Sequence, residues 1–119
     1  MNLYVIVDNN TIIDKYYKGE PALSFYIEDN DCKILFDTGY SDIFLENAQK
    51  MGINLCDIDC IVLSHGHNDH TCGLQYLMNF EFNKKVKIFA HPLTFNKKID
   101  ADGPEIGCPV SIDDLNKKF

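Results

Sequence analysis

The sequence predicts an α/β fold in which one sheet packs against helices. Short apolar runs rich in β-branched and aromatic residues alternate with stretches whose apolar residues recur at helical spacing. Polar residues separate two of these runs, 23–28 and 33–36, in a pattern typical of a hairpin. With 119 residues, the chain is long enough for one small domain. The strands and helices would therefore form a single pair of layers.

The first half of the chain contains three predicted strands and one predicted helix. Residues 3–7 form a strand that ends at a polar turn, and the hairpin follows it. A helix is expected over residues 41–51, because Ser41 can cap its start and Gly52 can end it. Residues 11–21 are ambiguous, and both a loop and a short helix remain open for them.

The second half continues the alternation. Residues 60–64 form an apolar strand, residues 71–80 a helix, and residues 86–90 another strand. Proline can open a short helix over residues 92–98. Beyond residue 98 the tail is rich in turn residues, and its structural signals are weak.

Composition limits the classes of partner. The net charge of −7 argues against nucleic-acid binding by bulk charge. All eleven basic residues are lysines, so the chain offers no guanidinium clamp for phosphate. No apolar run approaches membrane-spanning length, and the first residues do not resemble a signal peptide. Five cysteines at spacings that match no disulfide framework favour a reducing, cytoplasmic compartment.

Three of the four histidines lie within six residues, where residues 65–70 read His-Gly-His-Asn-Asp-His directly after the strand 60–64. Imidazole and carboxylate are ligands of zinc and related ions. In an extended segment His65 and His67 would point the same way, whereas the adjacent Asp69 and His70 would diverge toward a second ion. Such a two-metal centre would turn a bridging water into a hydroxide nucleophile, which indicates hydrolysis.

These segments resemble a known family. The His-x-His-x-Asp-His segment and residues 35–39, Leu-Phe-Asp-Thr-Gly, are similar to motifs of the metallo-β-lactamase superfamily of metal-dependent hydrolases. Residues 23–28, 57–64 and 90–92 resemble the branch named for dihydropterin–ribofuranosylaminobenzene phosphate synthase, and the resemblance covers residues 1–98. It implies the N-terminal half of a four-layered αββα sandwich, with a mixed sheet and helices on one face.

The resemblance also implies roles for individual residues. His65 and His67 would bind a first ion, Asp69 and His70 a second, and Asp69 would also orient or deprotonate the attacking water. Zinc is expected, with manganese or iron as alternatives. Asp37 would accept a hydrogen bond from a ligating imidazole, or else serve as a turn residue.

Two further side chains carry open alternatives. His91 would contact substrate at the rim of the site, or would bond the backbone at the end of its strand. Cys72, two residues after His70, could reach an ion or could be a small side chain at a helix start. The second interpretation is favoured for both residues, for Cys72 because the site of the family that the chain resembles does not need a thiol there.

The short length of the chain leaves two functional hypotheses open. The resemblance implies that the complete fold draws further ligands from a second half, and no histidine follows His91. Residues 1–119 would therefore form one partial domain. The first hypothesis is a metal-dependent hydrolase of a small molecule, or a truncated or split half of one. The alternative is a non-catalytic metal-binding or subunit-interaction module. A C-terminal half or a second copy of the chain is the expected protein partner.

Overall fold

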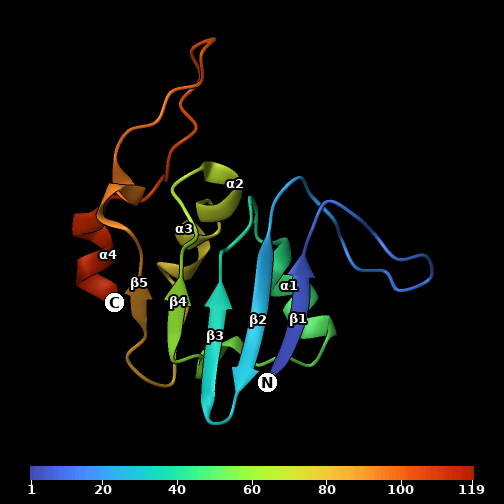
Figure 1. The fold of residues 1–119 in the computed structure, drawn as a ribbon. Coiled ribbons are helices and arrows are strands. Elements are labelled where there is room, and N and C mark those ends of the chain that lie inside the picture. Colours follow the sequence, from blue (N-terminus) through green and yellow to red (C-terminus); the bar gives the residue numbers. More distant parts are fainter.

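A computed structural model describes all residues from 1 to 119. Its centre is a five-stranded mixed sheet in the order β1-β2-β3-β4-β5 (Figure 1). The first three strands pair antiparallel, whereas β3, β4 and β5 run parallel. The strands are β1 (Asn2–Val7), β2 (Ser24–Asp29), β3 (Cys32–Phe36), β4 (Cys60–Val62) and β5 (Lys87–Phe89). The expected α/β class and mixed sheet are confirmed.

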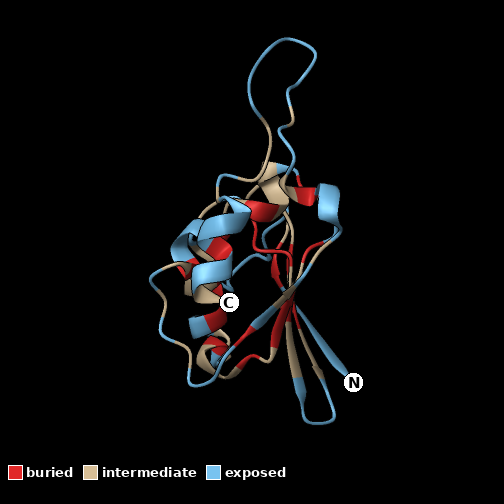
Figure 2. Ribbon diagram, turned by 90° about the vertical axis from the view of Figure 1, so that its left-hand side faces the viewer, coloured by how far each residue is buried: buried red, intermediate tan, exposed pale blue.

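The chain forms four α-helices and two short 3-10 turns, and the α-helices lie on one side of the sheet, as expected (Figure 2). The α-helices are α1 (Ile43–Lys50), α2 (Asn68–Thr71), α3 (Leu74–Leu77) and α4 (Ile112–Lys118), and the 3-10 turns are η1 (Leu55–Asp57) and η2 (Pro92–Phe95). No helix is both long enough and apolar enough to span a membrane.

The strand register separates two faces of the sheet. The covered face carries a cross-strand row of Tyr4, Tyr26, Leu35, Ile61 and Ile88. Tyr26, Leu35 and Ile61 are fully buried there, because side chains of the helices pack over them. The buried helical partners are Phe44, Ala48, Leu74, Leu77 and Leu115. This face holds the hydrophobic core.

The opposite face is also apolar, although no helix covers it. One continuous row crosses all five strands through Val5, Phe25, Phe36, Val62 and Phe89. The rings of Phe25 and Phe36 stack with their centroids 6.1 Å apart. Val5 and Phe89, at the two ends of the row, are 45% and 54% exposed. A sheet with two apolar faces, only one of them covered, presents surface that is typical of an interface.

The predicted helix over residues 71–80 is wrong in its extent. The structure has two short helices, α2 and α3, and the first of them begins at Asn68, inside the histidine motif. The break is at Gly73, whose amide donates to Gly39 O instead of continuing the helix. Gly73 packs so closely on Thr38 that a Cβ atom there would overlap the carbonyl oxygen of Thr38. A contact with a distant segment therefore ends α2.

Three other elements differ from the sequence analysis. The short helix expected over residues 92–98 is the 3-10 turn η2, which ends at Phe95. The helix expected from residue 41 begins at Ile43, with Asp42 at its N-cap; the Ser41 hydroxyl accepts from Ile43 N and donates to Glu20. The tail contains helix α4, which was not predicted. Ser111 caps that helix by accepting a hydrogen bond from Asp114 N at 3.1 Å. Residues 11–21 form no regular element.

Candidate metal centre

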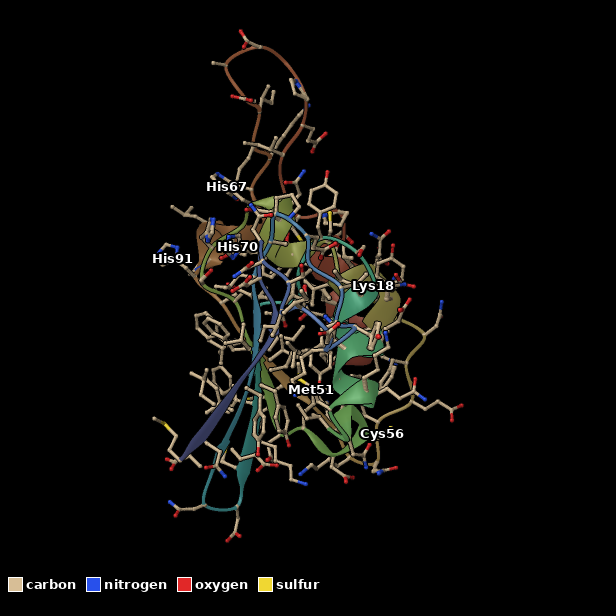
Figure 3. The ribbon with its side chains drawn as sticks, turned by 90° about the vertical axis from the view of Figure 1, so that its right-hand side faces the viewer. Lys18, Met51, Cys56, His67, His70 and His91 are labelled. Atoms are coloured by element: carbon tan, nitrogen blue, oxygen red, sulfur yellow. The ribbon has the colours of Figure 1, made fainter.

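The predicted ligands gather at the edge of the sheet where β3 and β4 end. Both strands are parallel, so the loops that follow them emerge side by side. Residues 37–39 follow β3, and the histidine motif follows β4 after Leu63 and Ser64. Figure 3 shows His67, His70 and His91 near this end of the molecule, with Met51 and Cys56 farther toward the other end.

Asp37 is the buried anchor of this edge. Its side chain is completely inaccessible, and its backbone is in the left-handed region with φ of 54°. The Asp37 amide donates to Val62 O at 2.9 Å, and its carbonyl accepts from the Ser24 hydroxyl at 2.8 Å. The backbone of Asp37 is thus bonded on both sides, which aims the carboxylate at the histidine loop.

The carboxylate of Asp37 accepts three hydrogen bonds. Its Oδ1 accepts from Ser64 N at 2.8 Å. Its Oδ2 accepts from the Ser64 hydroxyl at 2.6 Å and from His70 Nδ1 at 2.8 Å. A buried carboxylate needs such donors because burial removes its water. Since Asp37 can only accept, His70 carries its proton on Nδ1, and its Nε2 lone pair is left free for an ion.

Ser64 links the Asp37 carboxylate to a second imidazole, that of His65. The Ser64 hydroxyl gives its proton to Asp37, so its oxygen is free to accept a bond from His65 Nδ1, 2.9 Å away. His65 is then protonated on Nδ1, like His70, and presents Nε2 outward. Desolvation lowers the pKa of His65, and the neighbouring His70 and His67 lower it further. The neutral imidazole that an ion requires is thereby favoured.

His65, Asp69 and His70 form one candidate ligand group. One ligand atom from each residue lies within 4.8 Å of the others. Asp69 Oδ2 lies 3.3 Å from His70 Nε2. The sequence analysis had assigned His65 to one ion and the Asp69–His70 pair to another, whereas the structure brings these three together. The ring centroid of His67 lies 4.7 Å from that of His65, at the border of the group.

Helix α2 sets the directions of the last ligands. His67 is its N-cap residue, and Asp69 and His70 lie in its single turn. The His67 carbonyl accepts from His70 N at 3.1 Å and from the Thr71 hydroxyl at 2.9 Å. Thr38 holds the other end, because its amide and its hydroxyl both donate to His70 O. His70 is therefore fixed through its backbone and its ring.

The donor set fits a divalent transition ion. Two imidazoles with free Nε2 atoms and one carboxylate supply the nitrogen and oxygen ligands that zinc accepts. The buried carboxylate of Asp37 behind His70 is the kind of outer partner that metal-binding histidines have. Asp69 Oδ2 faces the open Nε2 of His70, so a cation between them would contact both atoms.

The remaining candidates lie outside this group. His91 Nδ1 accepts a hydrogen bond from Leu93 N at 3.2 Å and caps η2, and its ring is exposed. Cys72 is half-buried and is not part of the ligand group. Burial raises the pKa of the Cys72 thiol, and the nearby Cys108 raises it further. Neither residue is positioned with His65, Asp69 and His70.

Ser64 and Thr38 are site residues that the sequence analysis missed. Ser64 was treated only as the last residue of the strand 60–64, and Thr38 only as part of a motif. The signal that could have identified them is their position, since each follows or precedes a chemically active residue at a strand end. Their partners lie far away in the chain, and no local pattern reveals such contacts.

Known proteins are similar to this chain in sequence and in fold. The family model of the metallo-β-lactamase superfamily matches residues 17–100. The 7,8-dihydropterin-6-methyl-4-(β-D-ribofuranosyl)-aminobenzene-5′-phosphate synthase of Methanocaldococcus jannaschii is 40% identical over 100 residues, which are 80% of this chain and 34% of that protein. An anti-Pycsar protein of Saccharibacillus brassicae is 28% identical over 93 residues, or 78% of this chain and 35% of that protein.

A solved structure is similar over nearly the whole chain. It is described as a metal-dependent hydrolase of the β-lactamase superfamily, with a TM-score of 0.75 and 27% identity. The match covers 98% of this chain and 39% of the solved one. The chain thus spans about a third of the length of the curated relatives it matches.

Proposed function

Because the chain belongs to the metallo-β-lactamase superfamily, we propose that it is the ion-binding N-terminal part of a metal-dependent hydrolase. One observation carries this proposal. The buried Asp37 carboxylate directs two imidazoles, His70 directly and His65 through Ser64, toward the same space as Asp69. A polar loop without an ion would not need a desolvated carboxylate and a serine relay behind its histidines.

The proposed roles follow from the contacts. His65 and His70 bind the ion through Nε2, with Asp69 as the third ligand and His67 completing the set or serving a second ion. Zinc is the first candidate, and manganese and iron are the alternatives. A bound ion would supply Lewis-acid polarisation and an activated water. Asp69 is partly exposed beside His70, so one of its carboxylate oxygens can also take up the proton of the attacking water.

The proposed substrate is a small molecule with an ester, lactone or phosphodiester bond. Lysines supply all the positive side chains that the chain could offer to a phosphate group. Binding of nucleic acid by bulk charge is not proposed, because the net charge is −7.

The five cysteines are all unpaired, which supports a reducing, cytoplasmic compartment.

A catalytic zinc needs three protein ligands and an open position, and a two-ion centre needs a bridging group as well. The group in this chain has three ligands with His67 beside it. We propose that the remaining ligands come from sequence corresponding to the part of the longer relatives that this chain does not match. That sequence could belong to the same protein or to a separate subunit.

Ion binding and hydrolysis test this proposal together. The 119-residue chain should retain zinc after dialysis, weakly, and should hydrolyse generic phosphodiester, lactone or thioester substrates negligibly. Adding a polypeptide that corresponds to the remaining part of a relative should raise ion retention and turnover in parallel. Turnover by the chain alone that is abolished in His67→Ala would contradict the need for a second part. Absence of any bound ion at neutral pH would reject the metal centre.

The uncovered face of the sheet favours a second candidate function, a subunit-interaction module. The row from Val5 to Phe89 is apolar across its whole width, and both ends of it are exposed. Burying one half-exposed phenylalanine is worth roughly 1 kcal/mol, so a row of this size can support an interface. The occupant would be the remaining part of the sandwich or a second copy of the chain.

Sedimentation of the purified chain distinguishes these occupants. A homo-oligomer whose mass falls to that of a monomer in Phe89→Lys would identify a second copy. The matched control is Gln49→Lys, which adds the same charge at an exposed position of α1, on the other side of the sheet. A monomeric chain that binds the added C-terminal polypeptide, and loses that binding in Phe89→Lys, would identify the rest of the sandwich instead.

A further inference from the structure

Gly66, between two of the histidines, packs directly against η2. It is buried, and a Cβ atom at this position would overlap Thr94 O and lie 2.6 Å from Lys98 Nζ. Only glycine allows this approach of two backbones. The peptide that joins His65 to His67 therefore rests on the turn at residues 92–95, which follows a different strand of the sheet.

Lys98 holds that turn together. Its ammonium donates to Leu93 O at 2.9 Å, Thr94 O at 2.9 Å and Asn96 O at 3.0 Å. Carbonyls at the end of a short helical turn lack most of their helical partners, and they repel one another when they converge. Leu93 O also accepts from Asn96 N at 3.2 Å. An ammonium group has three donors and no acceptor, so Lys98 satisfies all three carbonyls at once.

The backbone of Lys98 reaches the histidine motif from the other side. Lys98 O accepts from Ile106 N at 2.9 Å, and Ile106 O accepts from Asn68 N at 2.8 Å. The next residue, Gly107, forms a β-bridge with His67. Residues 66–68 are thus held between the turn at 92–95 and the strand-like segment at 106–107, and Lys98 contacts both.

We infer that Lys98 is a positioning residue for the metal loop, which it holds through η2 and through Ile106. That this loop binds a metal rests on the proposed function. That Lys98 holds the loop in place does not depend on it. Lys98 touches neither an ion ligand atom nor a substrate, and its three donors are all used by carbonyls. Its effect reaches His65 and His67 only through the backbone of residues 66–68.

Three variants test this inference. Lys98→Met keeps the apolar stem and removes all donors. Lys98→Gln replaces the ammonium with an amide that has two donors. It is compared with the original chain if the methionine variant does not fold. Lys97→Met is the matched control, because Lys97 is exposed and its ammonium makes no hydrogen bond or ion pair. Folding is checked by circular dichroism before each measurement.

The first measurement is amide hydrogen exchange without any ion. In Lys98→Met, the amides of Asn68 and Ile106 should exchange at least tenfold faster, while those of β2 and β3 keep their rates. Lys98→Gln should fall between, and Lys97→Met should match the original chain. A uniform rise of the exchange rate in every strand would show that Lys98 contributes only general stability. An unchanged exchange rate at Asn68 would refute the inference.

The second measurement is Co²⁺ binding, followed by visible absorption and by competition with a chelator. Lys98→Met should lower the Co²⁺ affinity about 10-fold, the lower end of the usual cost of losing an outer partner, and should change the absorption bands. An original chain that binds no Co²⁺, combined with faster Asn68 exchange in Lys98→Met, would reject the proposed metal centre but support the positioning role. Unchanged Co²⁺ affinity and spectrum in Lys98→Met would overturn that role.

Discussion

His70 Nδ1 donates to Asp37 Oδ2 at 2.8 Å, although the two residues are 33 positions apart in the chain. This bond joins the loop after β3 to the helix after β4. The same carboxylate binds Ser64, which in turn contacts His65. One buried side chain therefore orients two imidazoles, His70 directly and His65 through Ser64.

Replacing Asp37 by asparagine should weaken ion binding by roughly 10–100-fold, because the amide cannot hold both imidazoles in one tautomer. The fold should persist, since the amide oxygen of the new side chain can still accept from Ser64 N. Titration with a competing chelator measures the change. Asp42→Asn is the control, as Asp42 makes no side-chain cap bond. Equal affinities in Asp37→Asn and the original chain would assign Asp37 to the turn alone.

Ser64→Ala should lower the ion affinity about tenfold by releasing His65 while leaving His70 held by Asp37. The distinguishing readout is the NMR signal of the two imidazole Nδ1 protons. The His65 signal should broaden or move, and that of His70 should stay sharp. If both signals move equally, the relay through Ser64 is not selective.

His65→Ala should reduce ion binding more than His67→Ala does. His65 shares the 4.8 Å group with Asp69 and His70, whereas His67 lies beside it. Elemental analysis after dialysis against zinc at neutral pH compares the two variants. The double variant should lose most of the bound zinc. A larger loss in His67→Ala would mean that His67, rather than His65, completes the first ligand set.

Gly73→Ala should destabilise the fold by about 2 kcal/mol or more, because a methyl group there overlaps the carbonyl of Thr38 and forces the backbone to move. Gly52→Ala is the comparison. Nothing lies near Gly52, so that change should cost only about 1 kcal/mol for its positive φ of 73°. Urea unfolding measures both values, and equal costs would contradict the close contact.

Asp59 should make the fold sensitive to acid. The pKa of Asp59 is lowered, first by the hydrogen bond from Lys84 and then by that from Lys33 N. A lowered pKa in the folded state stabilises the fold above the unfolded value of about 4, and this contribution is lost as the pH falls below it. Melting temperatures should therefore differ between Asp59→Asn and the original chain at pH 7, and this difference should shrink progressively as the pH falls below about 4. The exposed Asp31→Asn variant is expected to show no such pattern.

The elements with local signals were predictable from the sequence. The hairpin of β2 and β3 was confirmed because apolar runs flank a polar turn, and Asn30 there adopts the left-handed conformation with φ of 53°. The strand before the histidines was confirmed, although it ends at Val62. Helix α4 had a local signal that the prediction overlooked, a serine followed three residues later by an aspartate.

The features that depend on distant contacts were not predictable. The helix over 71–80 breaks at Gly73 because of Thr38, which lies 35 positions earlier. The motif located the ligand residues, but their grouping depends on where α2 begins. The relay from Asp37 through Ser64 requires the parallel register of β3 with β4, and no pattern within either strand specifies it.

The left-handed backbone at Asp37 also limits how this position can evolve. Glycine, asparagine and aspartate tolerate such a conformation, whereas most other side chains are strained there. Of these three, only aspartate carries a negative charge. Glutamate would keep the charge but would meet both the strained backbone and a longer reach to His70. The replacements that this backbone tolerates therefore remove the negative charge. A single substitution at Asp37 would thus remove the carboxylate that orients both His65 and His70.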